Sequence, residues 1–485
     1  MANDQANSGE LSHTYECSRD YHLFGPGPKR ILALDGGGVR GAISVAFLER
    51  IEQIFSEHQR AAIVERIAAA GRAGVAIETL AEERAKAQSQ VARLGDWFDL
   101  IGGTSTGALI SGALALGYNT DEIKKFYLER ASFIFQRPFW RIPGLQAKFD
   151  ARALQKEIDA VVADRTFDST DLITGVCVVS KRMDTGSPWI ISNNPLTPYW
   201  NSKRPDPASG DKGFIGNRHY RLATLVRAST AAPHFFDPEI VRIVGEDEEG
   251  KQHAATHEEE HDPLSKLNSS LGRFPRTTML LTKIRALLLA RKAGPNPETH
   301  GLFVDGGVTP FNNPSIATLM QVVLKPYGIC WPLGPEALTF VSIGTGSYRP
   351  RLSFTELGFA GPVKLALHAL LSMMSDSQTQ ALAQMQWLGE CPDPWPINSE
   401  LGTLADERPP GSRWFRFVRY DVRLERDWIK DNLDQNLSEK DIVRCRNMDD
   451  PGIIVEIYAL ACEAAKRQVK AEHFFPPVAR QAGAT

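Results

Sequence analysis

The sequence has no long apolar run, no closely spaced cysteine pair and little excess of either charge. No stretch reaches the roughly 18 apolar residues that a membrane-spanning helix needs. The polar N-terminus also lacks the apolar segment of a secretory signal. The six cysteines form no C-x-x-C pair and are too sparse for a secreted disulfide scaffold. We therefore expect reduced thiols in a cytoplasmic protein, with peripheral contact to a membrane left open. The cysteines are Cys17, Cys177, Cys330, Cys391, Cys445 and Cys462.

The charge balance gives no sign of a nucleic-acid partner. The 485 residues carry a formal net charge of −3, whereas binding to a polyanion requires a basic excess or a basic stripe. This length fits one large α/β core with added helical elements.

Short apolar runs alternate with helical patterns, which predicts a layered α/β fold. The first run, residues 30–34, is typical of a buried parallel strand, and an amphipathic helix follows it after a glycine loop. Residues 106–116 and the chain from residue 427 onward read as helical, with residues 453–469 the clearest case. The other predicted strands are residues 97–103, 175–180, 189–192, 302–304, 338–343 and 414–420.

Ser105 lies in the G-x-S-x-G motif formed by Gly103, Ser105 and Gly107, between a predicted strand and a predicted helix. A nucleophile on such a turn has a strained backbone, and only glycines two residues to either side leave room for it. The helix N-terminus behind the serine favours a developing negative charge. The motif alone is weak, but the strand–turn–helix context that it requires is present.

A glycine loop follows the first predicted strand and contains Gly36, Gly37, Gly38 and Gly41. Successive glycines expose backbone N–H groups, which an oxyanion hole requires. The same residues match the dinucleotide fingerprint G-x-G-x-x-G. That alternative needs a second strand ending in an acidic residue about 20 residues later, and this region instead reads as helical.

Asp305 follows an apolar run and precedes Gly306 and Gly307. A carboxylate at the end of one strand can lie close to a residue at the end of another. Taken alone, however, an Asp-Gly-Gly sequence is better explained as a capped turn. Only its occurrence with the other two motifs makes Asp305 a candidate for catalysis.

Together and in this order, the three motifs resemble the patatin-like phospholipase family over roughly residues 29–314. Residues 228–233, 312–314 and 342–346 also look like segments of that family. The resemblance implies Ser105 as the nucleophile and Asp305 as the general base, without a histidine. It implies an oxyanion hole of Gly36, Gly37 and Gly38, to which we add Thr106 at the start of the helix. Gly41, Gly103, Gly107, Gly306 and Gly307 would support these motifs.

The implied architecture is a three-layer α/β fold, with a central, mostly parallel sheet between helices. We expect a polar tail over residues 1–28 and a patatin-like domain over residues 29–318. Insertions are predicted at about residues 60–94, which read as helical, and at residues 245–270, which read as a polar loop. Residues 319–485 should complete and cover the core as a helical extension.

The implied activity is hydrolysis of fatty-acyl esters of phospholipids or lysophospholipids through an acyl-enzyme, with water as the acceptor. We expect no cofactor, and no metal, because the sequence has no Asp/Asn-rich calcium loop. Two alternatives stay open. A transacylase would use the same dyad with another acceptor, and some bacterial patatin-like enzymes resemble membrane-degrading effectors controlled by a nucleotide signal.

Several other patterns favour ordinary structural explanations. His368 and His473 follow Asp305 in the order of a hydrolase triad, but neither lies in a recognisable motif. Residues 257–261 match the zinc motif H-E-x-x-H within an acidic, polar segment, which favours solvated charge over a metal site. Arg40 is expected to stabilise the glycine loop rather than bind a head group.

Two segments combine apolar or aromatic residues with basic ones. They are residues 135–141 and the predicted helix over residues 279–292. Packing in the core explains the predicted helix better than a position on a bilayer, and the shorter segment has the same two explanations. Our hypothesis is nevertheless that one of the two contacts lipid.

Overall fold

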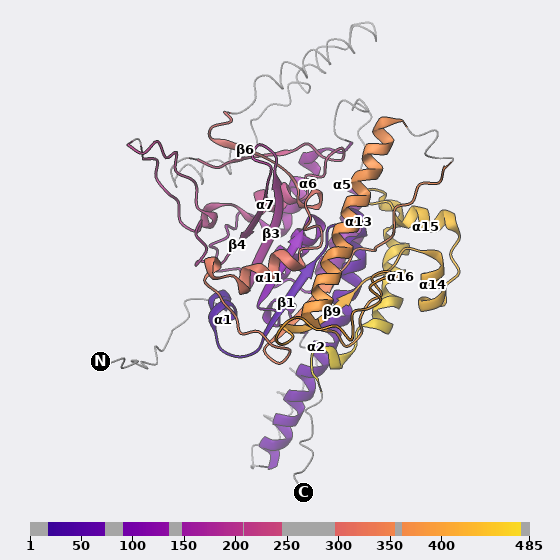
Figure 1. Ribbon diagram of the computed structural model, residues 1–485. Helices are drawn as coiled ribbons and strands as arrows, with labels where there is room; N and C mark the ends of the chain where they lie inside the picture. Colours follow the sequence, from indigo (N-terminus) through magenta and orange to yellow (C-terminus); the bar gives the residue numbers. More distant parts are fainter. Residues whose placement is uncertain are drawn as a thin grey trace.

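The computed structural model describes residues 18–72, 91–134, 148–206, 208–244, 296–354 and 361–476. Within these ranges the chain forms one nine-stranded mixed sheet flanked by helices (Figure 1). The strand order is β5-β6-β3-β2-β1-β7-β9-β8, and β4 also pairs with β3. The strands are β1 (Lys29–Leu34), β2 (Leu100–Thr104), β3 (Gly175–Arg182), β4 (Ser187–Ser192), β5 (Glu239–Arg242), β6 (His300–Asp305), β7 (Leu338–Ile343), β8 (Gly389–Glu390) and β9 (Phe415–Tyr420).

Most of the sheet is parallel, as predicted. β3, β2, β1, β7, β9 and β8 pair in parallel, whereas β4 and β6 run antiparallel to β3, and β5 runs antiparallel to β6. Parallel strands end at the same edge of a sheet, so the segments that follow β1, β2, β7 and β9 meet there. The antiparallel β6 also ends at this edge, close to the end of β2.

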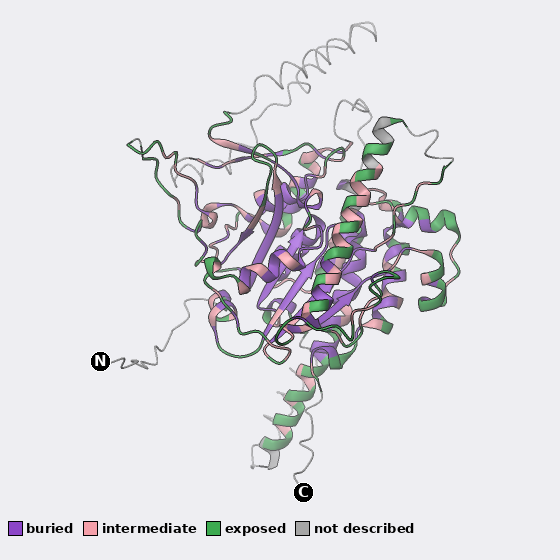
Figure 2. Cartoon of the chain, in the orientation of Figure 1, coloured by how far each residue is buried: buried purple, intermediate pink, exposed green. Residues whose placement is uncertain are grey.

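The apolar residues of β1 alternate between two cores, because successive side chains of a strand point to opposite faces. Leu32 and Leu34 pack in one core, and Ile31 and Ala33 in another. Both faces of the sheet are therefore buried, which explains why β1 is apolar throughout. Figure 2 shows the strands as the most uniformly buried part of the chain.

Helices form the two outer layers. The first core also includes residues of α2 (Gly41–Arg72), α4 (Thr106–Ala115), α5 (Thr120–Ile134), α14 (Arg426–Leu433), α15 (Glu439–Cys445) and α16 (Ile454–Gln468). A neighbouring core on α4 includes α6 (Ala151–Val162) and α7 (Leu222–Ser229). The core on the opposite face includes α1 (Ser18–Phe24), α11 (Ser315–Val323) and α13 (Pro362–Leu388).

The structure differs from the sequence-based expectation in three places. The expected polar tail ends earlier, because α1 is a helix whose Leu23 is fully buried. Residues 60–72, expected to belong to a separate insertion, continue α2 instead, and this end of the helix projects from the body (Figure 1). The short strands β5 and β8 were not predicted.

Some predictions lie outside the described residues. They concern residues 1–17, residues 73–90 of the predicted insertion, the acidic segment with its H-E-x-x-H motif, and both segments with the proposed lipid contact. Among the helices that the structure does describe, none is long and apolar enough to cross a membrane.

Candidate active site

Ser105 occupies a sharp turn between β2 and α4. Its backbone has φ 56° and ψ −123°, a region that residues other than glycine rarely adopt. The chain is tightly folded here, because a Cβ on Gly103 would lie 2.2 Å from the carbonyl oxygen of Gly107. A Cβ on Gly107 would likewise lie 2.2 Å from the carbonyl oxygen of Leu34, so no larger residue fits at either position. The turn is the strained elbow that the sequence predicts.

The sheet register places Asp305 beside Ser105. Thr104 of β2 pairs with Val179 of β3, and the next β3 residue, Ser180, pairs with Asp305 of β6. The Ser105 Oγ donates a hydrogen bond to Asp305 Oδ2 at 2.6 Å, although the two residues are 200 positions apart. The structure thus brings together the predicted nucleophile and the predicted base.

The carboxyl group of Asp305 is buried, with only 5% of the residue exposed. Its second oxygen, Oδ1, accepts the backbone N–H of Gly307 at 2.6 Å. Burial raises the pKa of Asp305 to about 6, and the bonds from Ser105 and Gly307 and the charge of Arg227 partly oppose this shift. A carboxylate with this pKa is ionised at neutral pH and is a stronger base than an exposed aspartate.

Ser229, at the end of α7, ties the elbow to the sheet. Its Oγ accepts the N–H of Ser105 at 2.8 Å and donates to the carbonyl oxygen of Val179 at 2.6 Å. Two residues further on, Ala231 accepts the N–H of Asp305 at 3.0 Å. Residues 228–233 were recognised only through their resemblance to the family. Their hydrogen bonds to Ser105 and Asp305 were not predicted from the sequence.

The glycine loop lies against Ser105, and its backbone N–H groups differ in whether they already have a hydrogen-bond acceptor. The N–H of Gly36 donates to the carbonyl oxygen of Asn312 at 3.0 Å. Within the described residues, the N–H groups of Gly37 and Gly38 have no such acceptor, and both residues line the pocket at Ser105. Of the three predicted oxyanion donors, Gly36 is therefore already engaged and two are free.

The loop is held by residues from distant parts of the chain. The carbonyl oxygen of Gly36 accepts Thr345 Oγ1 at 2.7 Å, and the N–H of Val39 donates to the carbonyl oxygen of Met448 at 2.9 Å. Gly38 has φ 59°, in the left-handed region, and a Cβ there would lie 2.2 Å from the Met448 oxygen. Arg40 donates to the carbonyl oxygen of Gly346 at 3.0 Å, which fits the expected structural role.

A buried ion network lies directly behind the glycine loop. Arg419 of β9 donates to both carboxylate oxygens of Asp35, at 3.0 and 2.7 Å, and to Asp421 at 3.0 Å. Burial raises the pKa of Asp35 to about 6 against the opposing charge of Arg419. The two carboxylates together raise the pKa of Arg419 although burial opposes this. Asp421 in turn accepts the N–H of Gly346 at 2.9 Å, so the network supports the turn that holds the loop.

We expect Arg419→Met to destabilise the protein by about 3–5 kcal/mol, because it removes the cation to which both buried carboxylates are hydrogen-bonded. Adding Asp35→Asn should recover part of this loss by removing one of them. Arg416→Met is the matched control on the same strand, since Arg416 pairs at 3.5 Å with the half-exposed Glu390. Thermal and denaturant unfolding measure the differences, and equal losses for Arg419→Met and Arg416→Met would contradict this account.

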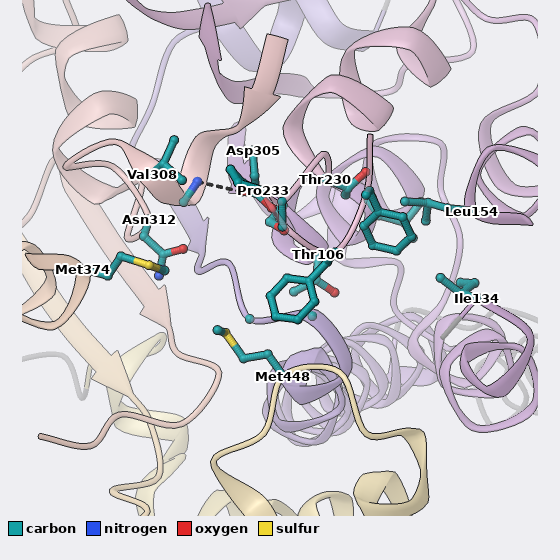
Figure 3. A pocket seen from close by; sticks show the side chains of 18 of the residues that line it. Thr106, Ile134, Leu154, Thr230, Pro233, Asp305, Val308, Asn312, Met374 and Met448 are labelled. Atoms are coloured by element: carbon teal, nitrogen blue, oxygen red, sulfur yellow. Dashed lines mark hydrogen bonds between the residues drawn. The ribbon is translucent and has the colours of Figure 1, made fainter. Parts of the chain in front are cut away.

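An apolar pocket opens beside Ser105 and Asp305. The residues that line this pocket come from both halves of the chain (Figure 3). Thr106 lines it at the first turn of α4, with its side chain bonded to the Tyr127 hydroxyl. The apolar residues that line it include Leu109, Phe126, Ile134, Leu154, Pro233, Phe235, Phe236, Val308, Leu370, Leu371, Met374 and Met448.

The two histidines that could complete a triad lie elsewhere. His473 is buried between the Tyr420 hydroxyl at 2.7 Å and Asp393 at 3.0 Å. His368 Nδ1 lies 3.4 Å from Ser372 Oγ on α13. Neither is among the residues that line the pocket. The described residues also contain no cluster of side chains suited to a metal ion.

A serine on a strained strand-to-helix turn, a carboxylate in contact with it and free backbone N–H groups nearby are typical of serine hydrolases. The α/β fold and this site define that class. Comparison with known proteins then gives the family. A sequence model described as patatin-like phospholipase matches residues 32–318, more than half of the chain. The protein therefore belongs to the patatin-like phospholipase family.

Similar proteins come from bacteria and plants. A cUMP-AMP-activated phospholipase of Escherichia coli is 28% identical over 213 residues, which is 44% of this chain and 50% of the relative. A cGAMP-activated phospholipase of Vibrio cholerae is 28% identical over 220 residues, covering 43% and 49%. The chain thus spans about half the length of these relatives. Patatin-like protein 1 of Arabidopsis thaliana is 24% identical over 338 residues, covering 65% and 58%.

Among solved structures, human GIVD cytosolic phospholipase A2 resembles the chain with a TM-score of 0.39 at 9% identity. The match covers 92% of this chain and 59% of the human protein.

Proposed function

We propose that the protein is a serine acyl hydrolase that cleaves fatty-acyl esters of phospholipids or lysophospholipids. The observation that carries the proposal is the 2.6 Å contact from Ser105 Oγ to Asp305 Oδ2 at the wall of an apolar pocket. A polar reactive pair next to apolar side chains suits a substrate with an ester bond and a long acyl chain.

In the proposed mechanism, Ser105 Oγ attacks the ester carbonyl carbon while Asp305 accepts the serine proton. The tetrahedral intermediate collapses to an acyl-enzyme, and Asp305 returns the proton to the leaving alcohol. Water then attacks the acyl-enzyme with Asp305 again as the base, which releases the fatty acid. One carboxylate thus does what histidine does in a triad.

The negative charge of the intermediate needs hydrogen-bond donors. The N–H groups of Gly37 and Gly38 support this role, because both are without an acceptor in the described residues and line the pocket. Thr106 adds a third candidate donor, since the first N–H groups of a helix have no partner within that helix. Gly36 is then a residue that holds the loop, because its N–H is bonded to Asn312.

The lipid class rests on the pocket and on the relatives. The names of the bacterial relatives state a phospholipase activity, and the pocket of this chain at Ser105 is lined mainly by apolar side chains. The proposal is tested by incubating the protein with phosphatidylcholine and with lysophosphatidylcholine and identifying the products by mass spectrometry. Free fatty acid with the matching deacylated lipid is the expected result, and no release from either lipid would contradict it. Activity should persist in a chelator, because the proposed mechanism uses no metal.

A transacylase would form the same acyl-enzyme and pass the acyl group to an alcohol. Adding glycerol or a lysophospholipid acceptor to the assay separates the two reactions. Hydrolysis predicts free fatty acid as the main product at all acceptor concentrations, whereas a transacylase predicts acylated acceptor in its place.

A second candidate function is hydrolysis switched on by a nucleotide. The observation in its favour is the description of two bacterial relatives as activated by cUMP-AMP or cGAMP. Hydrolysis assays with and without each of these nucleotides test it. A large increase in rate with either one would support regulation, and an unchanged rate would favour constitutive activity.

The pH dependence of the proposed reaction follows from Asp305. Its carboxyl group must be ionised to accept the serine proton, and its pKa is raised to about 6. We therefore expect kcat/KM to rise with pH around a midpoint of about 6 and then to stay level through neutral pH. His368→Ala should leave the profile unchanged. A profile that loses its acid limb when His368 is replaced would contradict a dyad without histidine.

A further inference from the structure

The long helix α13 has fully buried residues only in its C-terminal half, among its described residues. Its C-terminal half contains the buried residues Ala381, Met385 and Gln386, and Met385 belongs to the core beneath the sheet. None of the described residues of α13 before Ala381 is buried. In Figure 2 the described residues in the N-terminal half of α13 have the exposed and intermediate colours.

The exposed half is nevertheless apolar. Leu365 is 45% exposed and Met373 is 66% exposed, and Ala366 and Ala369 are also exposed. Residues 365, 369 and 373 follow the four-residue spacing that places side chains on one side of a helix. The sequence has no acidic residue from position 357 to position 375, and the next one, Asp376, is exposed one turn after Met373. A solvated helix face normally carries charged residues of both signs, so this face is unusual for a surface in water.

The same stretch of α13 forms part of the active-site pocket. Leu370, Leu371 and Met374 line that pocket together with Ser105 and Asp305. Figure 3 shows Met374 beside Asn312, on the wall opposite Leu154 and Ile134. The exposed Ala366 is followed at four-residue spacing by Leu370 and Met374, so these three residues lie on one side of the helix. The exposed apolar face is therefore continuous with the wall of the pocket.

A second exposed apolar group precedes the helix. The side chain of Phe354 is 96% exposed, and the nearby Arg351 is also exposed. Exposed aromatic and basic residues, close in sequence to an apolar helix face, are the combination found where proteins contact lipid surfaces.

We propose that Phe354, Leu365, Ala366, Ala369 and Met373 form a docking face that binds the surface of a lipid bilayer. An acyl chain leaving the bilayer would then pass from this face along Leu370 and Met374 to Ser105. This inference rests on the proposed lipid substrate. It differs from the sequence-based hypothesis, which placed lipid contact at residues 135–141 or 279–292.

Lipid fits the docking face better than a second copy of the chain. The face leads into a pocket that must admit a lipid chain, so a permanent protein partner on it would cover the entrance. The exposed Arg351 and the uncharged side chains at positions 365, 366, 369 and 373 also suit the anionic surface of many bilayers.

The test separates binding from catalysis by using Ser105→Ala protein, which leaves the lipid intact. Vesicles of equal parts phosphatidylcholine and phosphatidylglycerol are mixed with this protein, with the same protein carrying Leu365→Ser and Met373→Ser, and with one carrying Phe354→Ser. Matched controls are Leu196→Ser and Met183→Ser, both 51% exposed in wild type and located on other elements. Flotation measures the bound fraction.

We expect each docking-face substitution to weaken vesicle binding about tenfold, because each removes a buried apolar side chain from the complex. The controls should bind like the parent protein. In the active enzyme, the docking-face substitutions should lower vesicle hydrolysis and leave the hydrolysis of a water-soluble short-chain ester unchanged. Equal vesicle binding by all variants would overturn the proposal, as would a parallel loss of both activities.

Two further outcomes are decisive. A wild-type dimer that the docking-face substitutions dissociate, with no vesicle binding by either form, would make this face a self-association surface and overturn the proposal. Vesicle binding that depends on the docking face, without hydrolysis of any ester by the active chain, would retain the docking face and reject the proposed function.

Discussion

Ser105→Ala is expected to lower kcat for ester hydrolysis by about 10⁴-fold or more, because it removes the atom that forms the acyl-enzyme. The fold should be retained, since the backbone strain of the elbow does not depend on the hydroxyl. Rates of fatty-acid release from lysophosphatidylcholine, measured beside circular dichroism spectra of both proteins, provide the test.

Ser111→Ala is the matched control for this substitution. Ser111 is a fully buried serine on α4, the helix that follows Ser105, and its Oγ has no hydrogen-bond partner among the described residues. Its loss should leave activity within a few-fold of wild type. Substantial activity in Ser105→Ala, or an equal loss in Ser111→Ala, would remove Ser105 from the proposed role.

Asp305→Asn is expected to lower kcat by about 10³- to 10⁴-fold while making the folded protein more stable at pH 8. Asparagine has nearly the same shape but cannot accept the serine proton, so the base is lost. The gain in stability has a separate cause, which is the unfavourable burial of a charged carboxylate.

The direction of the stability change follows from the pKa of Asp305. The pKa is about 6 in the folded protein and 3.8 in its ordinary state. Between these values the folded state holds a proton that the unfolded state has lost, so stability falls as pH rises through this range. Above about pH 6 the difference corresponds to about 3 kcal/mol, which Asp305→Asn should recover. Below about pH 4 the two proteins should be equally stable on this account.

Asp184→Asn is a control for the stability measurement. The pKa of Asp184 is lowered by its hydrogen bonds from Arg182 despite partial burial, the opposite of Asp305. Its replacement should therefore give no gain in stability at pH 8. Thermal unfolding at pH 4 and pH 8 compares the proteins. If the Asp305→Asn protein were less stable than wild type at pH 8, the ionised carboxylate of Asp305 would be stabilising, contrary to this expectation.

Local sequence patterns were sufficient to predict most strands of the sheet and the turn that carries Ser105. The apolar runs at β1, β2, β3, β4, β6, β7 and β9 were long enough to be recognised, and the G-x-S-x-G motif marks a turn with a specific steric requirement. β5 has four residues and β8 has two, too few to show any periodicity. α1 was missed because a seven-residue helix in a polar context gives little signal.

The partners that organise the site could not be predicted in the same way. Asp305 was recognised through resemblance, because a register between β3 and β6 across the sheet brings it to Ser105. Ser229 and Arg419 have ordinary local sequences, and their importance comes only from contacts made across 124 and 384 residues of chain. Long-range contacts of this kind leave no mark in the spacing of nearby residues.

The C-terminal part of the chain contributes directly to the site. The family model ends at residue 318, yet Thr345, Met374, Arg419 and Met448 lie beyond it and contact the glycine loop, the ion network or the pocket. We therefore expect that a protein shortened to the matched region would lose the support of its glycine loop.

Trapping the acyl-enzyme and locating its acyl group tests directly whether Ser105 is the nucleophile and Asp305 its base. Wild-type protein is mixed with an activated fatty-acyl ester, quenched in acid after a fraction of one turnover, and digested for fragmentation by mass spectrometry. We expect one acyl group on Ser105 in wild type and far slower acylation in Asp305→Asn. An acyl group on Ser111 or on any other residue, or equally fast acylation of Asp305→Asn, would contradict it.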